Sequence, residues 1–165
     1  MKSSLAGYIS DAGVELATVT NSRGQLELTE YQVSFQGLER ICSFLIESNG
    51  KLEVDWLTAA TDRPSTIIEK ALAGSDAIAS AAMDLFIDCY ASEAANLALK
   101  SMTLGGLFVG GAIAPRIVTL LEKGRFMERF VKRGKMERLL TNVPVGIIIE
   151  ERTALLGAAK VALTL

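Results

Sequence analysis

Two short apolar runs, each bordered by residues that favour turns, most constrain the fold of this chain. The first, LFV, lies between the pairs Gly105-Gly106 and Gly110-Gly111, and the second, VGIII, follows Pro144. Neither run shows the alternation of a strand with one solvent-facing side. Continuous apolar strands separated by helical segments are typical of parallel strands covered on both faces. The pattern predicts an α/β protein.

The remainder of the chain adds an antiparallel meander in front of these strands and helices around them. Residues 4–9, 14–20 and 25–33 have strand patterns, with a turn signal at 21–24. Apolar spacing and capping residues predict helices over 38–49, 62–73, 75–100, from 115, over 124–141 and from 153. The order is βββ-α-β-α-β-α. We expect one domain over residues 1–165, with a mixed five-stranded sheet, three strands antiparallel and two parallel, and helices on both faces.

The composition excludes several kinds of site. The 165 residues include no histidine, which removes Ser–His and Cys–His catalysis and histidine metal ligands. Cys42 and Cys89 are far apart within apolar helical patterns, so both are expected to be buried structural thiols. A formal net charge of −2 gives no field that attracts nucleic acid.

The hydropathy pattern indicates a cytoplasmic protein. No run of about 18 uncharged apolar residues is present, so no membrane span is expected. The first residues, MKSSLAGYISDAG, lack the apolar region of a signal peptide.

Two charged clusters have simple structural interpretations. Residues 123–138 hold seven basic and two acidic residues, which we interpret as a solvated helix face with Phe126 and Phe130 turned inward. A nucleic-acid surface is the weaker interpretation of that segment. Asp84 and Asp88, one helical turn apart, are expected to be solvated carboxylates, so no metal ligand is assigned.

The glycines after the first apolar strand are candidate ligand contacts. In open α/β sheets, ligands bind outside the carboxyl ends of the strands. Glycine there leaves bare backbone, so Gly110-Gly111-Ala112 could support a flat ring. Tight packing of a helix on the sheet would explain the same glycines equally well.

The segment GGLFVGGAIAPRI resembles the adenosine-binding segment of bacterial glucokinases, approximately GG-x-(apolar)2-x-GG-I-A-P. The similarity extends over residues 64–165, including KGRF, RGKM and ERTALLGAAKVAL. It implies a ribonuclease H-like (actin-like ATPase) domain of a hexokinase-family transferase. Such glycolytic kinases phosphorylate the 6-hydroxyl of glucose with ATP and Mg²⁺ and are commonly dimers. The resemblance assigns adenosine contact to Gly110, Gly111, Ala112 and Pro115.

Residues 5–55 allow two placements in that family. LAGYISDAGVELATV resembles the family's N-terminal strand–loop–strand, which would leave the catalytic middle of the family missing from this chain. Alternatively, SDAGVELA resembles the sugar-binding Glu-Gly-Gly-His segment, and VSFQGL a later Ser-Gly-Pro-Gly-Leu segment. The Leu-Ala-Gly opening and the Lys-Leu-Glu-Val-Asp end favour the first placement.

The chain departs from the family pattern in either placement. On the first, the positions of the family's Asp, Gly-Gly-Thr-Asn and Arg hold Tyr8, Ser10, Asp11, Ala12, Gly13 and Glu15. On the second, Asp11 stands for the sugar-binding Glu, the family histidine is absent, and Gln36 lies near another sugar-binding Glu. Carboxylates in a phosphate loop repel phosphates, so no catalytic residue is assigned.

These departures predict a glucokinase-like chain with weak or absent ATP binding, doubtful glucose binding and no activity alone. The alternative is a noncatalytic nucleotide-binding or protein-interaction module derived from a glucokinase. The high mean hydropathy, +0.32, favours a homo-oligomer that covers apolar surface.

Overall fold

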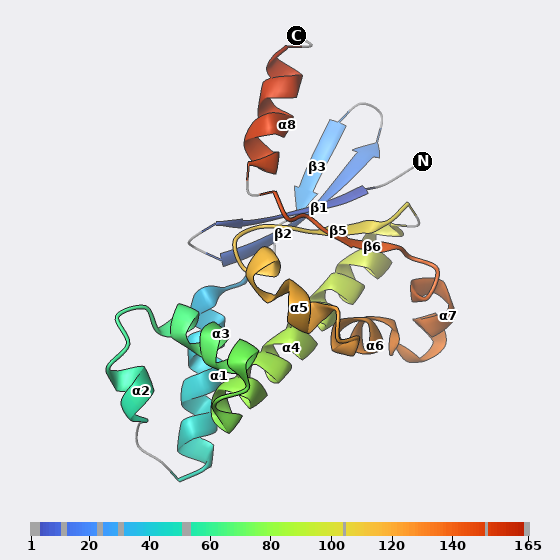
Figure 1. The fold of residues 1–165 in the computed structure, drawn as a ribbon. Helices are drawn as coiled ribbons and strands as arrows, with labels where there is room; N and C mark the ends of the chain where they lie inside the picture. The colour runs from blue at the N-terminus through green and yellow to red at the C-terminus, as the bar shows by residue number, and fades with distance from the viewer. Residues whose placement is uncertain are drawn as a thin grey trace.

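A mixed sheet forms the centre of the chain (Figure 1). The computed structural model describes residues 4–10, 13–22, 25–29, 32–50, 54–103, 105–150 and 152–163, and up to residue 33 only the backbone. The strand order is β3-β2-β1-β5-β6. The antiparallel part comprises β1 (Ser4–Ser10), β2 (Gly13–Ser22) and β3 (Gln25–Thr29). The strand β5 (Leu107–Val109) is parallel to β1, and β6 (Val145–Ile147) is parallel to β5.

The α/β class predicted from the sequence is confirmed, but the described residues form a sheet of six strands and not five. The segment expected as one strand over 25–33 forms β3 and a separate two-residue strand, β4 (Gln32–Val33). Both pair with β2, β3 at Thr18–Ser22 and β4 at Val14-Glu15. One edge of the long strand β2 therefore pairs with two short strands. The alternation of residue types in the sequence does not show where one of these short strands ends and the other begins.

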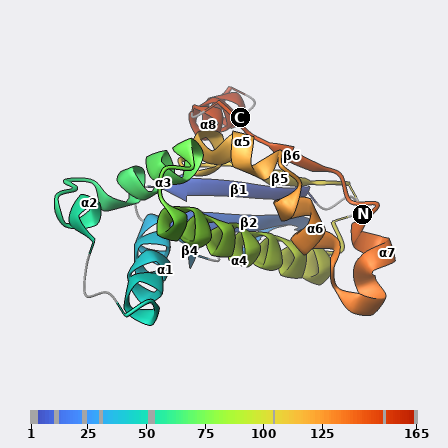
Figure 2. The same cartoon turned by 60° about the horizontal axis from the view of Figure 1, so that its bottom comes forward.

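Helices α1 to α7 lie on one side of the sheet, and α8 rises from the other (Figures 1 and 2). The expected cover by helices on both faces is thus only partly realised. The α-helices are α1 (Phe35–Ser48), α2 (Asp55–Thr58), α3 (Arg63–Ala73), α4 (Ala77–Ser101), α5 (Val118–Leu121), α6 (Arg125–Val131), α7 (Glu137–Leu140) and α8 (Thr153–Ala162). Two 3-10 helices are η1 (Ala114–Ile117) and η2 (Gly134–Met136).

Short polar side chains start the longer helices. The Asp62 carboxylate accepts a hydrogen bond from the Ser65 backbone N–H at 3.1 Å, and that of Asp76 accepts one from the Ala79 N–H at 2.8 Å. Gly74 ends α3 at a φ of 62°, where residues with a side chain are strained. The sequence predicts Asp62 as the cap of the first of these helices and either Ser75 or Asp76 as the cap of the second, and the structure has Asp62 and Asp76, because capping depends only on neighbouring residues.

The helix expected over 124–141 is instead three short elements, α6, η2 and α7. The break falls at Lys132–Gly134, where Gly134 takes a φ of 56°. The two inward aromatic residues are confirmed, since Phe126 and Phe130 are both buried.

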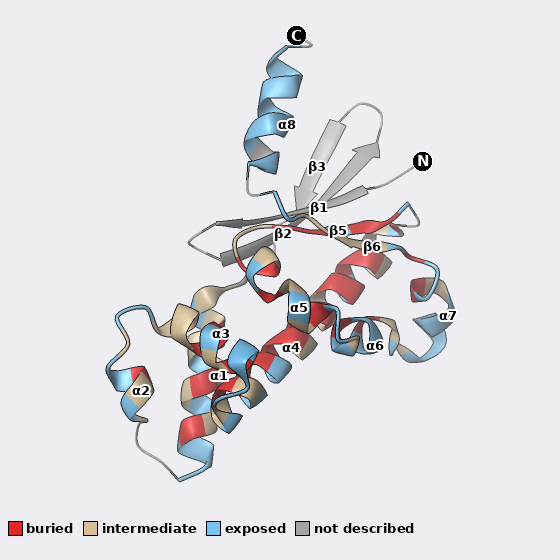
Figure 3. Ribbon diagram, in the orientation of Figure 1, coloured by how far each residue is buried: buried red, intermediate tan, exposed pale blue. Residues whose placement is uncertain are grey.

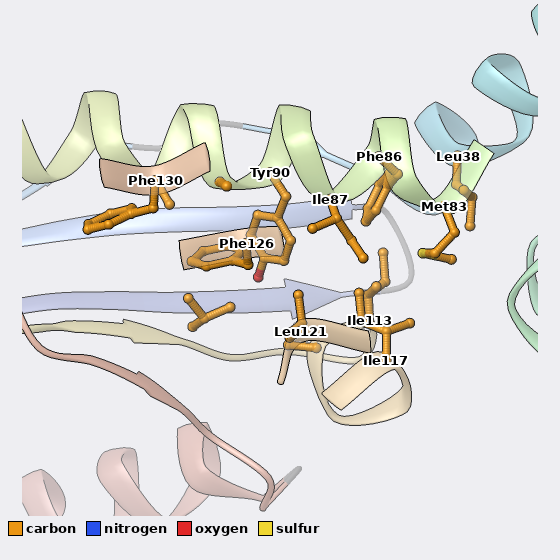
Figure 4. Packing of buried hydrophobic residues seen from close by; sticks show 14 of the residues in the cluster. Leu38, Met83, Phe86, Ile87, Tyr90, Ile113, Ile117, Leu121, Phe126 and Phe130 are labelled. Carbon is orange, nitrogen blue, oxygen red and sulfur yellow. The ribbon is translucent and has the colours of Figure 1, made fainter. Parts of the chain in front are cut away.

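The core lies between the sheet and α4, as the burial pattern shows (Figure 3). Tyr90 of α4 contacts Phe86 and Phe126 at ring-centroid distances of 6.1 Å and 5.7 Å (Figure 4). The apolar spacing over residues 75–100 predicts a buried stripe that includes Leu85 and Cys89, but both are exposed. The expectation that Cys89 is buried was wrong, because α4 packs between the sheet, α6, α1 and α3, and the buried arc runs through other positions.

Candidate functional site

The two glycine pairs flank β5, and the second glycine of each pair has a left-handed backbone. Gly106 has a φ of 124° and Gly111 a φ of 97°. A Cβ on Gly106 would lie 3.3 Å from both the Cγ and the carbonyl oxygen of Pro144. The pair before β5 is therefore explained by close packing against the residue that leads into β6. The pair after β5 lies at the carboxyl end of that strand, where ligands bind in open α/β sheets.

The four residues with a predicted adenosine contact lie at the carboxyl end of β5. Its parallel partner β6 continues beside it, and the Ile148 N–H donates to the Val109 carbonyl oxygen at 2.8 Å. Gly110 is buried, while Gly111, Ala112 and Pro115 are half-buried. These four residues lie in the bend that follows β5 and in the first residues of η1.

The turn η1 is fixed to the beginnings of two helices. The Arg116 guanidinium donates to the Ser65 hydroxyl at 2.8 Å and lies 5.8 Å from the ring centroid of Phe35. The Ser65 hydroxyl in turn donates to the Asp62 carboxylate. Hydrogen bonds from Ser65, and more weakly the charge of Arg116, hold the pKa of Asp62 below its usual value. The beginnings of α1 and α3 therefore lie close to the turn that follows Gly110-Gly111.

Two residues near this site, Arg116 and Ser65, belong to no motif in the sequence. Arg116 directly follows Pro115, so its nearness to the glycines could have drawn attention to it. Ser65 is 51 residues away in the chain, and no local pattern signals its contact with Arg116.

A small apolar cavity lies at the carboxyl ends of β5 and β6. Its volume is about 90 Å³, and its lining is Val109, Leu121, Glu122, Phe126, Met127, Val145 and Ile147. Ligand pockets for whole small molecules usually measure about 300–1,000 Å³. This cavity is too small for a nucleotide.

The acidic pair on α4 has a partner in the basic segment. Arg125 donates two hydrogen bonds to the Asp88 carboxylate, at 2.9 Å and 2.8 Å, and one to that of Asp84 at 3.3 Å. This bidentate contact joins α6 to α4. It gives Asp84, Asp88 and Arg125 a structural role within the described residues.

Several residues singled out in the sequence lie outside the described part of the chain. Asp11 and Ala12 lie outside the described residues, as do the side chains of Tyr8, Ser10 and Glu15. Gln36 is described, and it is exposed in the first turn of α1. Among the helices that the structure describes, none combines the length and apolar character needed to cross a bilayer.

The chain is similar to glucokinases in sequence. The family model "Glucokinase" matches residues 9–165. The chain is 44% identical to a glucokinase of Synechocystis sp. (strain ATCC 27184 / PCC 6803 / Kazusa) over 110 residues, 67% of this chain and 31% of the relative. It is 36% identical to a glucokinase of Caulobacter sp. (strain K31) over 154 residues, 93% of this chain and 44% of the relative. The chain therefore spans less than half the length of these relatives.

Solved glucokinase structures share the fold. The glucokinase from an Antarctic psychrotroph superimposes with a TM-score of 0.77 at 23% identity, over 96% of this chain and 57% of the other. The glucokinase of Balamuthia mandrillaris, solved in complex with glucose, has a TM-score of 0.57 at 16% identity, over 87% of this chain and 49% of the other. At these identities the two solved structures show only that the fold is shared. The family model, in contrast, matches the sequence itself over residues 9–165. Together with the strand order and the glycine-flanked strand β5, that match shows that the chain belongs to the glucokinase family.

Proposed function

We propose that residues 1–165 form one ribonuclease H-like domain that binds the adenosine of ATP–Mg²⁺ on the turn after β5. The observation that carries the proposal is the left-handed φ of 97° at Gly111, at the carboxyl end of a parallel strand. Glycine adopts this conformation without strain, and it has no side chain that would stand between the backbone and an incoming ring. Gly110, Gly111, Ala112 and Pro115 are the proposed contacts.

Charge near the turn also supports a nucleotide. The exposed Arg116 follows the proposed contacts directly, and its guanidinium is held by Ser65 at 2.8 Å. A guanidinium is well suited to phosphate oxygens. The carboxylate of Asp62 is linked to Arg116 through the Ser65 hydroxyl, and its negative charge would repel phosphate oxygens and weaken that attraction. We therefore expect weak binding, with a dissociation constant on the order of a millimolar.

The proposed domain does not phosphorylate glucose by itself. Phosphoryl transfer depends on positioning and on neutralising charge around the transferred group. The adenosine turn supplies neither, and the sequence offers no assigned base for the sugar hydroxyl. Phosphorylation of glucose with ATP and Mg²⁺ is the proposed activity of a complete kinase of this family, acting in glycolysis in the cytoplasm.

Isothermal titration with ATP–Mg²⁺, first alone and then with glucose, tests this function. We expect saturable, weak binding that glucose leaves unchanged. Gly111→Val should abolish the binding, because a branched side chain would occupy the ring position. Gly124→Val is the matched control: Gly124 also has a left-handed φ, 95°, but lies in the turn before α6.

Two results would contradict the proposal. Absence of heat at millimolar nucleotide would leave Gly110-Gly111 as packing residues only. Binding strengthened by glucose, or glucose 6-phosphate formed by the chain alone, would show a working sugar site.

A second function has its own supporting observation, the exposed apolar helix α8. It favours a noncatalytic protein-interaction module, and homo-oligomerisation is one form of that function. Light scattering on the purified chain distinguishes a monomer from an oligomer.

A further inference from the structure

Arg116 directly follows the four residues proposed to contact adenosine, and both ends of this residue are held in place. At the backbone end, the Arg116 N–H donates to the Ile113 carbonyl oxygen at 2.9 Å. Its neighbours Ala114 and Ile117 in η1 are fully buried, as is Ile113. The base of the Arg116 side chain is therefore anchored to the core.

At the other end, the guanidinium is held by the beginnings of α1 and α3. Nη2 of Arg116 donates to the Ser65 hydroxyl at 2.8 Å, and the guanidinium carbon lies 5.8 Å from the ring centroid of Phe35. The Ser65 hydroxyl donates its own hydrogen to the Asp62 carboxylate, which leaves the Ser65 oxygen free to accept from Arg116. Figure 2 shows α3 beside the segment between β5 and α5, and the guanidinium links these two parts of the chain.

The held guanidinium keeps donors available for a ligand. A guanidinium carries several N–H donors in one plane. Among the residues that the structure describes, Ser65 is the one hydrogen-bond acceptor for these donors, and the Arg116 side chain is exposed. Immobilising an arginine side chain costs rotamer entropy. The contacts with Ser65 and Phe35 restrict the side chain before a ligand arrives, which favours binding.

We propose that Arg116 forms a phosphate subsite beside the 110–115 turn, and that Ser65 and Phe35 are the positioning residues that hold it there. The inference rests on the proposed binding of adenosine to this turn. The ribose of a nucleotide separates its phosphates from the base, and an arginine next to the base contacts has the length to span that separation. The subsite makes the turn select nucleotides over nucleosides. The glycines and Pro115 cannot make this distinction, because they carry no charge.

Magnetic-resonance titrations of the isotope-labelled chain with adenosine and with ADP, at low salt and without Mg²⁺, test the subsite. The amide signals of Gly110, Gly111 and Ala112 report the binding of both ligands. We expect ADP to bind about fivefold more tightly than adenosine, because an exposed charge pair contributes modestly. Arg116→Gln should abolish this preference and Ser65→Ala should reduce it to about twofold, since alanine leaves the charge but removes its support. Neither variant should change the affinity for adenosine.

Two matched variants separate positioning from a general loss of structure or charge. Ser65→Thr keeps a hydroxyl at the same place and should restore the preference for ADP. Arg129→Gln removes the same charge from another exposed arginine, on α6, and should leave the preference unchanged. Equal weakening of adenosine and ADP binding by Ser65→Ala would show that Ser65 only supports the fold of the turn. That result, or a preference for ADP that survives Arg116→Gln, overturns the proposal.

Pyrophosphate tests the subsite without adenosine. Its addition should shift the Arg116 Nε–H signal saturably, and the shift should be smaller in Ser65→Ala. The Arg129 Nε–H signal in the same spectrum is the reference, because equal shifts at both arginines would show nonspecific attraction and overturn the subsite. A specific shift at Arg116 in a chain that binds neither adenosine nor ADP would support the subsite and contradict the proposed function. Absence of a shift overturns the subsite, whether or not adenosine binds.

Discussion

The Tyr90 hydroxyl is a buried polar group without a hydrogen-bond partner in the described structure. Burial raises the pKa of Tyr90, so the group stays protonated, and its O–H remains an unsatisfied donor. An unmade hydrogen bond of this kind costs about 1–3 kcal/mol. The ring itself is well placed, in edge contact with Phe126.

Tyr90→Phe should therefore raise the free energy of unfolding by about 1 kcal/mol, because it removes the hydroxyl and keeps the ring. Urea denaturation followed by circular dichroism measures the change. Tyr90→Leu is the control, and it should destabilise the chain by loss of the aromatic contacts. A less stable Phe variant would show that the hydroxyl has a partner in solution.

Gly106 gives a second prediction at this scale. Gly106→Ala combines a φ of 124° with a Cβ 3.3 Å from Pro144, so it should lower the free energy of unfolding by about 2 kcal/mol. Gly157→Ala is the same substitution on α8, where a Cβ meets nothing within 4 Å. It should change global stability by no more than about 0.5 kcal/mol. Equal effects in thermal unfolding would contradict the proposed role of the first glycine pair.

At the scale of elements, the cap of α3 predicts a pH dependence. Hydrogen bonds from Ser65 lower the pKa of Asp62 in the folded chain, so the unfolded chain binds this proton at higher pH. The stabilisation is complete above the unfolded pKa and is lost as pH falls through the folded value. Between about pH 5 and pH 3, the original chain should lose more stability than Asp62→Asn, which keeps an oxygen acceptor for the cap.

Chemical denaturation at several pH values, read as the difference between the two proteins, checks this expectation. The difference should be constant from neutral pH down to about pH 5 and then move in favour of the Asn variant. Parallel curves across the acid range would mean that Asp62 titrates normally in the folded chain.

Elements governed by neighbouring residues were predictable from the sequence, and those governed by distant contacts were not. The caps at Asp62 and Asp76 and the apolar strands β5 and β6 follow from local patterns. The strand β4 and the exposure of Cys89 depend on which surfaces β2 and α4 meet in the folded chain. The candidate site divides in the same way, since Gly111 stands in a recognisable motif and the Arg116–Ser65 contact spans 51 residues.

At the scale of the whole molecule, stability is expected to be uneven. The helix α4 contributes 11 buried residues, whereas every side chain described on α8 is exposed. Amides exchange slowly where opening requires loss of a buried core and quickly where it does not. The two helices therefore lie at opposite ends of the protection scale, although both belong to one family fold.

Hydrogen exchange followed by mass spectrometry should find the slowest amides of the isolated chain in α4 and fast amides in α8. Protection of α8 equal to that of α4 in the isolated chain would mean that the helix already packs against something.

The contrast between the two thiols has a practical consequence. Cys42 is buried, and burial, with Asp76 and Glu39 nearby, raises its pKa to about 11, whereas Cys89 is exposed on α4. Thiolates are the reactive species, so a maleimide dye will attach at one position of the native chain without any engineering. Cys42 becomes reactive only when the core opens, and a second dye incorporated over time would count unfolding events molecule by molecule.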